Sequence, residues 1–357
     1  MCATTLLRRL LTASLLVSLI AAGTAHTHAS NWIISGDGNY NTSGNWSAGV
    51  PNGVDATADF STVDISTDVL VDIDANVTLG QLVFGDTNLG SAGTWAISDD
   101  DATPAIMTFD AASKPTITVG ELTPTALFDD SYLGVVLAGT NGFRKLGPGI
   151  LTTAAYEEAG GALRLLNHSI NGSIDIEAGT FRINTGAFFD DTEPGIASFK
   201  LFNGATLEST ESVALNPIAV DTGATVNVTS IGSGNTSYEV IGNGTGEIIN
   251  YFNNTSNSMD IVGQTSLGFA QWNISGDPNS PDRLTDQVRL NINNNTIPAN
   301  NNTFANSKVH LDAITLSVRT NSFGNDVAIG ELSGTSTGAL AGGGPGWADE
   351  MPEIWEI

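Results

Sequence analysis

The segment from Gly142 to Ile183 constrains the fold most, because short apolar runs alternate with glycine turns along its length. Apolar side chains fall at every second position in 174–176 and again in 180–183, and Ala178-Gly179 separates the two runs. A period of two is that of a half-buried β-strand, and glycine readily makes the tight turn between strands. The pattern therefore predicts consecutive short strands, and it carries no catalytic signature.

Two motifs in this segment carry a family resemblance. Residues 145–151 read K-L-G-P-G-I-L, and residues 177–183 read E-A-G-T-F-R-I. They resemble the opening K-x-G-x-G-x-L and the closing A-G-T-L-x-V of the autotransporter-associated β-strand repeat, a module of exported bacterial surface proteins. The middle departs, because residues 155–160 read A-Y-E-E-A-G where that family has an Asn-Thr-Tyr-x-Gly run. The resemblance implies a β-solenoid architecture and export, and it implies no reaction.

Residues 1–29 have the layout of a secretory signal peptide. Two arginines precede an apolar run from Leu10 to Ala22, and small residues follow the run. The run is shorter than the ~20 residues that a membrane-spanning helix needs. We therefore expect cleavage between Ala25 and Ala29, no membrane span in the mature protein, and a secreted or outer-cell-surface location.

Composition narrows the class of protein further. The formal charge is −26, with 38 acidic and 12 basic residues, and such a surface repels phosphates and anionic lipids. We therefore expect no nucleic-acid partner. The one cysteine, Cys2, lies in the signal segment, so the mature protein has no thiol for a disulfide. The 40 glycines and the 41% hydrophobic content favour an all-β chain with a buried core.

An aromatic-rich block follows the signal segment. It contains Trp32, Tyr40, Trp46 and Phe60, and it resembles the N-terminal start of exported repeat proteins. We expect these rings to close the open end of a β stack, because an uncapped end exposes apolar side chains and unpaired strand edges. The alternative is a platform of exposed rings that stack on carbohydrate.

Turn glycines recur downstream of this block. Gly179, Gly204 and Gly223 each precede a strand-like run, and their spacings of 25 and 19 residues (204 − 179 and 223 − 204) are near the ~20-residue period of solenoid coils. Further strands are expected at 77–84, 117–122, 248–252, 271–274, 309–312 and 329–334. The asparagine runs at 291–295 and 300–302 are interpreted as surface loops or as turns of an asparagine ladder.

These patterns predict an all-β, parallel β-helix or solenoid-like fold with an aromatic-rich N-terminal cap. A sandwich-like or inserted unit is the alternative for the C-terminal part. The expected divisions are 1–29, the signal peptide; 30–100, the cap and first strands; 101–229, the solenoid containing the repeat 142–183; 230–341, an irregular β continuation; and 342–357, a tail.

Clustered aspartates are the candidate metal ligands. Asp72 and Asp74 would share one strand face, and a run of three follows at Asp99, Asp100 and Asp101. Carboxylates of this kind suit calcium, so calcium is the candidate ion although no motif requires a cofactor. Paired carboxylates on an acidic β-helix also suggest the catalytic carboxylates of pectin-active enzymes.

The histidine and basic motifs that accompany the carboxylates in those enzymes are missing from the sequence. His168 lies in an N-H-S triplet, His310 lies in V-H-L, and no R-x-K element is present. We therefore expect no enzymatic activity.

The sequence predicts a non-enzymatic, secreted or cell-surface structural or adhesive protein. One alternative is an extracellular polysaccharide-binding protein or a pectate-lyase-like enzyme, with Trp46, Trp95 and Trp272 as ligand-binding rings in an open groove. Another is a truncated fragment of a larger surface repeat protein, since no translocator-barrel sequence follows the repeat. The expected partners are extracellular polysaccharide or components of the cell envelope.

Overall fold

The computed structural model describes eighteen segments of the chain. They are residues 29–99, 103–123, 131–154, 156–159, 162–184, 197–210, 218–231, 236–238, 240–241, 246–253, 259–262, 270–276, 287–292, 300–312, 314–320, 326–335, 339–343 and 353–356. The predicted signal peptide, except Ala29, lies outside them, as do Asp100 and Asp101. Within the described segments the only helical element is the 3-10 turn η1 (Ser43–Asn45), and none of these residues forms a helix that could cross a bilayer.

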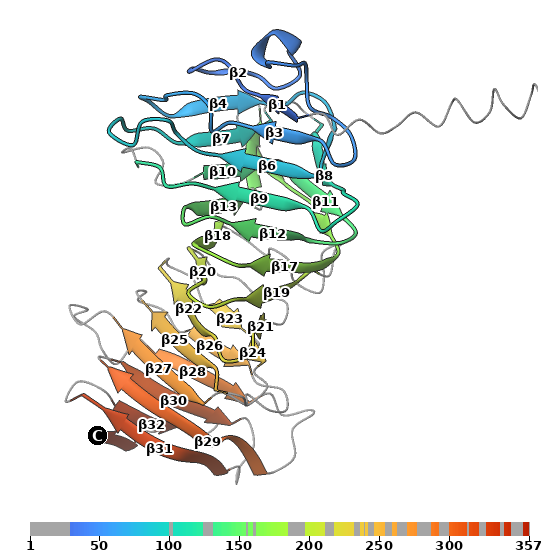
Figure 1. The fold of residues 1–357 in the computed structure, drawn as a ribbon. Helices are drawn as coiled ribbons and strands as arrows, with labels where there is room; N and C mark the ends of the chain where they lie inside the picture. The colour runs from blue at the N-terminus through green and yellow to red at the C-terminus, as the bar shows by residue number, and fades with distance from the viewer. Residues whose placement is uncertain are drawn as a thin grey trace, which may run out of the picture.

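The described strands stack along one long axis, in pairs that are parallel with two antiparallel exceptions (Figure 1). Twelve strands form the longest sheet, in the order β2 (Gly38–Asn39), β4 (Val69–Asp72), β7 (Trp95–Ser98), β10 (Ser131–Gly134), β13 (Ile150–Ala154), β18 (Thr180–Asn184), β20 (Thr206–Ser209), β22 (Thr225–Ser230), β25 (Ile248–Asn253), β27 (Gln271–Gly276), β29 (Asn300–Asp312) and β31 (Asp326–Gly334).

Three smaller sheets complete the coils. Nine strands form the second sheet, in the order β1 (Ala29–Asn31), β3 (Thr57–Asp59), β6 (Gln81–Phe84), β9 (Thr116–Val119), β12 (Phe143–Leu146), β17 (Gly172–Ile176), β19 (Ala197–Leu201), β21 (Ile218–Val220) and β24 (Val240–Ile241). The four-stranded sheet contains β16 (Ser169–Ile170), β11 (Val136–Gly139), β8 (Ile106–Phe109) and β5 (Val77–Leu79). The six-stranded sheet contains β23 (Thr236–Tyr238), β26 (Met259–Val262), β28 (Gln287–Ile292), β30 (Thr315–Thr320), β32 (Ala339–Gly343) and β33 (Glu353–Glu356).

The order in which the chain visits these sheets changes along the solenoid. In the first half, each coil passes from the twelve-stranded sheet to the four-stranded sheet and then to the nine-stranded sheet, as in β4, β5 and β6. From β25 onward, strands alternate between the twelve-stranded and six-stranded sheets, so the coil becomes two-sided. The predicted all-β, parallel solenoid is confirmed. Its C-terminal part continues the same long sheet, which also runs across the expected divisions at 100 and 229.

The predicted repeat forms one coil and part of the next. Ile174 and Ile176 of β17 point inward, as do Phe181 and Ile183 of β18, which confirms the period-two alternation. The part that departs from the family pattern forms an extra antiparallel hairpin of β14 (Tyr156–Ala159) and β15 (Ala162–Leu165). This insertion therefore leaves the stacking of β13 on β18 intact.

The aromatic block packs together at the N-terminal end. The ring of Phe60 lies 5.4 Å from Trp32, 5.2 Å from Trp46 and 6.5 Å from Tyr40, between ring centroids, and it also stacks on Phe84 of the next coil at 5.6 Å. All five rings are at most 3% exposed. Their burial supports the cap interpretation and excludes a solvent-facing platform made of these rings.

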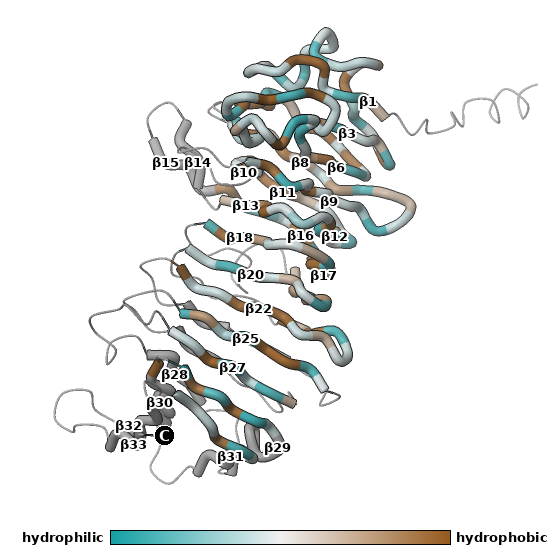
Figure 2. Tube along the Cα trace, turned by 60° about the vertical axis from the view of Figure 1, so that its left-hand side comes forward, coloured by the Kyte–Doolittle hydropathy of each residue, from teal (hydrophilic) through white to brown (hydrophobic). Residues whose placement is uncertain are grey.

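Aromatic stacking continues down the core. The centroids of Phe109 and Phe143 are 5.3 Å apart, those of Phe143 and Phe181 are 6.1 Å apart, and those of Phe181 and Phe199 are 5.9 Å apart. Each ring belongs to a different strand, so each coil covers the apolar face of its neighbour. In the view of Figure 2, apolar and polar residues alternate along these stacked strands.

Two turn glycines provide a matched test of how closely the coils approach. Gly142 and Gly204 have φ values of 61° and 81°, so alanine is strained at both positions. A Cβ at Gly142 would lie 1.8 Å from the carbonyl oxygen of Ser173 on the next coil, whereas a Cβ at Gly204 meets nothing within 4 Å. We expect Gly204→Ala to cost about 1 kcal/mol and Gly142→Ala at least ~2 kcal/mol more. Urea unfolding measures both, and equal costs would contradict the close approach.

Candidate functional site

The three tryptophans predicted to bind ligand lie in the core. Trp46 is 3% exposed, and Trp95 and Trp272 are fully buried. Trp95 donates its Nε1 hydrogen to the carbonyl oxygen of Gly85 at 2.8 Å, and the ring of Trp272 stacks on Tyr251 at 5.9 Å. These rings offer no face to a sugar, because they occupy inward positions of their strands. An aromatic groove built from them is therefore not part of the fold.

The predicted calcium ligands separate into two places. Asp72 and Asp74 do converge, because the Nδ2 of Asn39 donates to a carboxylate oxygen of each, at 3.3 and 2.9 Å. Asp99 is 1% exposed and accepts a hydrogen bond from the backbone N–H of Ala105. Within the described segments, no three histidine, cysteine, aspartate or glutamate side chains gather as a metal site. Asp100 and Asp101 lie outside those segments.

Aspartates in the N-terminal coils fasten one coil to another. The carboxylate of Asp37 accepts the backbone N–H of Leu70 at 2.8 Å, 33 residues away. Asp68 accepts the N–H and the hydroxyl of Thr94, at 3.2 and 2.8 Å. Each bond joins neighbouring coils, so part of the unusual acidity has a structural role in the turns.

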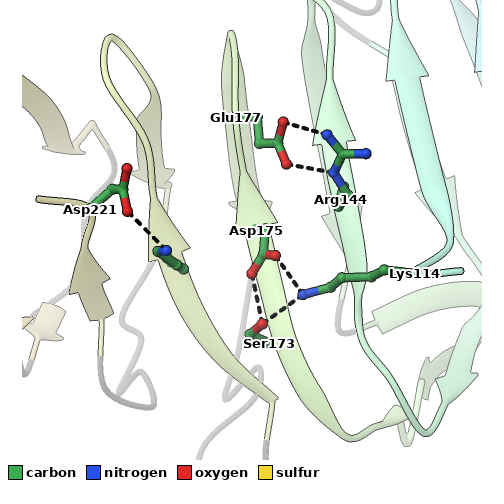
Figure 3. Close-up of polar contacts among 7 residues, drawn as sticks. Lys114, Arg144, Ser173, Asp175, Glu177 and Asp221 are labelled. Carbon is green, nitrogen blue, oxygen red and sulfur yellow. Dashed lines mark hydrogen bonds and ion pairs between the residues drawn. The ribbon is translucent and has the colours of Figure 1, made fainter. Parts of the chain in front are cut away.

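The structure describes six basic side chains, and each of them makes contacts within the molecule. Five of the six form ion pairs with a carboxylate from another coil: Lys114–Asp175, Arg144–Glu177, Arg182–Glu208, Lys200–Asp221 and Lys308–Glu331. Figure 3 shows the bidentate pair of Arg144 with Glu177, and Lys114 bound to both Ser173 and Asp175. These five side chains therefore present no unpaired cation to an anionic ligand.

The sixth basic residue, Lys145, is buried in the core. Its Nζ donates to the carbonyl oxygens of Gly147 at 2.8 Å, Ala178 at 2.9 Å and Gly149. Burial lowers the pKa of Lys145 to about 7, and the three acceptors oppose that shift because only the ammonium form has three hydrogens to donate. Lys145 thus joins the two glycine turns of the predicted repeat, which gives its K-x-G-x-G motif a physical reason.

His168 is a second buried ionisable group, next to the base of the β14–β15 hairpin. Its Nδ1 accepts the backbone N–H of Leu137 at 3.0 Å, so Nε2 carries the hydrogen and donates to the carbonyl oxygen of Ala154 at 2.9 Å. Burial lowers the pKa of His168 to about 4. The neutral ring therefore serves as a structural bridge between strands β11 and β13.

A chain of amides crosses the outward face of the twelve-stranded sheet. Asn273 donates to Asn250 at 2.8 Å, Asn250 donates to Asn227 at 2.9 Å, and Asn227 donates to the hydroxyl of Thr206 at 3.2 Å. Gln271 starts the chain by donating to Asn273 at 2.7 Å. All the bonds run in one direction, so they polarise one another and hold the amides in fixed orientations.

The sequence interpretation did not identify these asparagines, and it took the runs at 291–295 and 300–302 as surface loops or as turns of an asparagine ladder. Residues 291–292 end β28 and 300–302 begin β29, while 293–295 lie outside the described segments. The true ladder had a signal in the sequence. Its asparagines stand between apolar residues in V-N-V, I-N-Y and W-N-I, spaced 23 residues apart.

A comparison with known proteins finds a curated protein that is similar to this chain. The chain is 29% identical over 266 residues to the adhesin BmaC autotransporter of Brucella suis biovar 1 (strain 1330). The alignment covers 71% of this chain and 7% of that adhesin. No family model and no solved structure matches the chain. The similarity relates this chain to a short stretch of a much longer autotransporter adhesin.

Replacing Lys145 tests its role in the turns. Lys145→Met keeps the apolar stem but leaves three carbonyls without their donor, so we expect a loss of about 2–4 kcal/mol in unfolding free energy. Lys200→Met is the matched control, because its ion pair with Asp221 is more than a third exposed on both sides, and it should cost at most ~1 kcal/mol. Similar losses of unfolding free energy for the two variants in urea would contradict a structural role for the buried ammonium group of Lys145.

Acidification tests the state of His168. Its pKa is about 4 in the folded chain and about 6.5 when unfolded, so the unfolded chain binds the extra proton between these values and stability falls as pH drops from 6.5 to 4. The full loss of unfolding free energy from this one group is about 3 kcal/mol. We expect His168→Gln to lack this component. Unfolding free energies of both proteins at pH 7 and pH 4 give the difference, and parallel pH profiles would contradict the buried neutral ring.

Proposed function

We propose that this chain is a non-enzymatic, secreted or cell-surface β-solenoid that serves as an adhesive or structural module. The similarity to an autotransporter adhesin over 71% of the chain carries this proposal. The fold supports it, because a stack of parallel coils presents long, regular outer faces and needs no mobile catalytic element. The sequence supports export through its signal-like start.

The polar contacts of the described segments favour a scaffold over a reaction centre. The aspartates Asp37 and Asp68 hold backbone groups of neighbouring coils, Lys145 holds two turns, and His168 bridges two strands. Each group is thus engaged in holding the coils together. We therefore propose that the acidic residues stabilise the column and that the outer sheet faces make the contacts with partners.

Adhesion of the isolated chain tests this function. Beads coated with residues 30–357 should be retained under flow on extracellular polysaccharide or cell-envelope surfaces more strongly than beads coated with the same protein unfolded by heat. Incubation with the same polysaccharides should release no new reducing ends or unsaturated products. Retention no better than that of the unfolded control would contradict an adhesive role, and steady product release would contradict the non-enzymatic assignment.

A further inference from the structure

One uncharged stretch of the outer surface carries the chain of hydrogen-bonded amides. On β22, β25 and β27, nine side chains point outward in register, and none is ionisable: Thr225, Asn227, Thr229, Ile248, Asn250, Phe252, Gln271, Asn273 and Ser275. All nine are partly exposed. We call this set the neutral platform. Uncharged outward residues also occur on β6 and β9, but only the neutral platform carries the chain of amides.

Charged residues border the neutral platform at both ends. The neighbouring strands on one side carry the ion pair of Arg182 with Glu208, and those on the other side carry Lys308, Glu331 and Asp312. The same sheet face is therefore charged, then neutral over three coils, then charged again.

The neutral platform combines oriented amides with two apolar side chains. Each amide of the Asn273–Asn250–Asn227 chain donates one of its two hydrogens along the chain, so its second N–H is available for a further acceptor. Ile248 and Phe252 stand on either side of Asn250 along β25. Fixed amide donors and acceptors suit hydroxyl groups, and the phenyl ring supplies an apolar surface for the C–H face of a sugar.

The spacing of these groups fits a polymer. Neighbouring parallel strands lie ~4.8 Å apart, so the amides repeat at that interval across the three coils. A polymer whose hydroxyl groups repeat at a similar interval can place one hydroxyl group against each amide. The charge of the protein favours an uncharged polymer. An acidic polysaccharide would be repelled by the acidic chain, and a cationic polysaccharide would be drawn to the carboxylates of the N-terminal coils.

We propose that the neutral platform on β22, β25 and β27 binds an uncharged polysaccharide, which runs across the strands with its hydroxyls on the amide chain and a sugar ring against Phe252. This inference rests on the proposed adhesive function and names the ligand class of that surface. It replaces the tryptophan groove as the carbohydrate-binding surface, since those tryptophans are buried.

A glycan array with neutral, acidic and amino-sugar polymers tests the proposal, using residues 30–357. We expect binding to at least one neutral polymer, and at least tenfold weaker binding by Phe252→Ala, which removes the ring. Thr225→Glu, which adds a charge at the rim without disturbing the core, should weaken binding as much. Thr118→Glu is the matched control on the outward face of β9 and should bind as the unchanged protein does. Circular dichroism melting confirms that each variant is folded.

The outcomes separate the inference from the function on which it rests. Binding confined to charged polymers, no binding to any polymer, or binding that both folded platform variants retain would overturn the neutral-platform proposal. If the coated beads are still retained under flow with these variants, the adhesive function stands and only the assigned surface fails. If unchanged protein gives no retention on any surface, the adhesive function itself fails.

Discussion

Parallel, in-register pairing of successive coils is the constraint on which the rest of the structure depends. A single coil cannot bury its inward side chains or satisfy the hydrogen-bonding groups at its strand edges, so each coil needs the next. Phe143 and Phe181 show the consequence in the core, where a ring from the nine-stranded sheet packs on a ring from the twelve-stranded sheet. The aromatic cluster around Phe60 meets the same need at the N-terminal end, where no earlier coil supplies a partner in the described chain.

The same pairing places like positions of successive coils beside one another on the surface. Side chains that would be isolated in one coil become ladders, as in the amide chain through Asn250 and the ion pair between Arg144 and Glu177. Ion pairs in this protein therefore connect one coil to another. The acidic composition is partly explained by aspartates such as Asp37 and Asp68, which accept backbone hydrogens of the neighbouring coil.

Much of the fold could be predicted from the sequence, because its signals are local. The period-two alternation in 174–176 and the turn at Gly179 each lie within a few residues, and the clustered rings around Trp32 lie within one stretch from Trp32 to Phe60. Contacts between coils could not be predicted, because coil length varies: Val71 pairs with Ile97, 26 residues on, whereas Leu133 pairs with Thr153, 20 residues on. The contact of Lys145 with Ala178, 33 residues on, was therefore beyond sequence reasoning, whereas the regular 23-residue spacing around Asn250 was a signal that could have been used. The burial of Trp95 and Trp272 was also within reach of sequence reasoning, since each shares its strand face with an isoleucine two residues later.

Pairwise cysteine cross-linking measures the in-register stacking most directly, because Cys2 is the only cysteine and can be replaced by serine. Parallel neighbours at ~4.8 Å are within the range of a disulfide, whereas residues two coils apart are not. Asn227→Cys paired with Asn250→Cys should cross-link on mild oxidation, and Asn227→Cys paired with Asn273→Cys should stay reduced. Cross-linking of the second pair but not of the first would contradict the register on which the core, the amide chain and the neutral platform all depend.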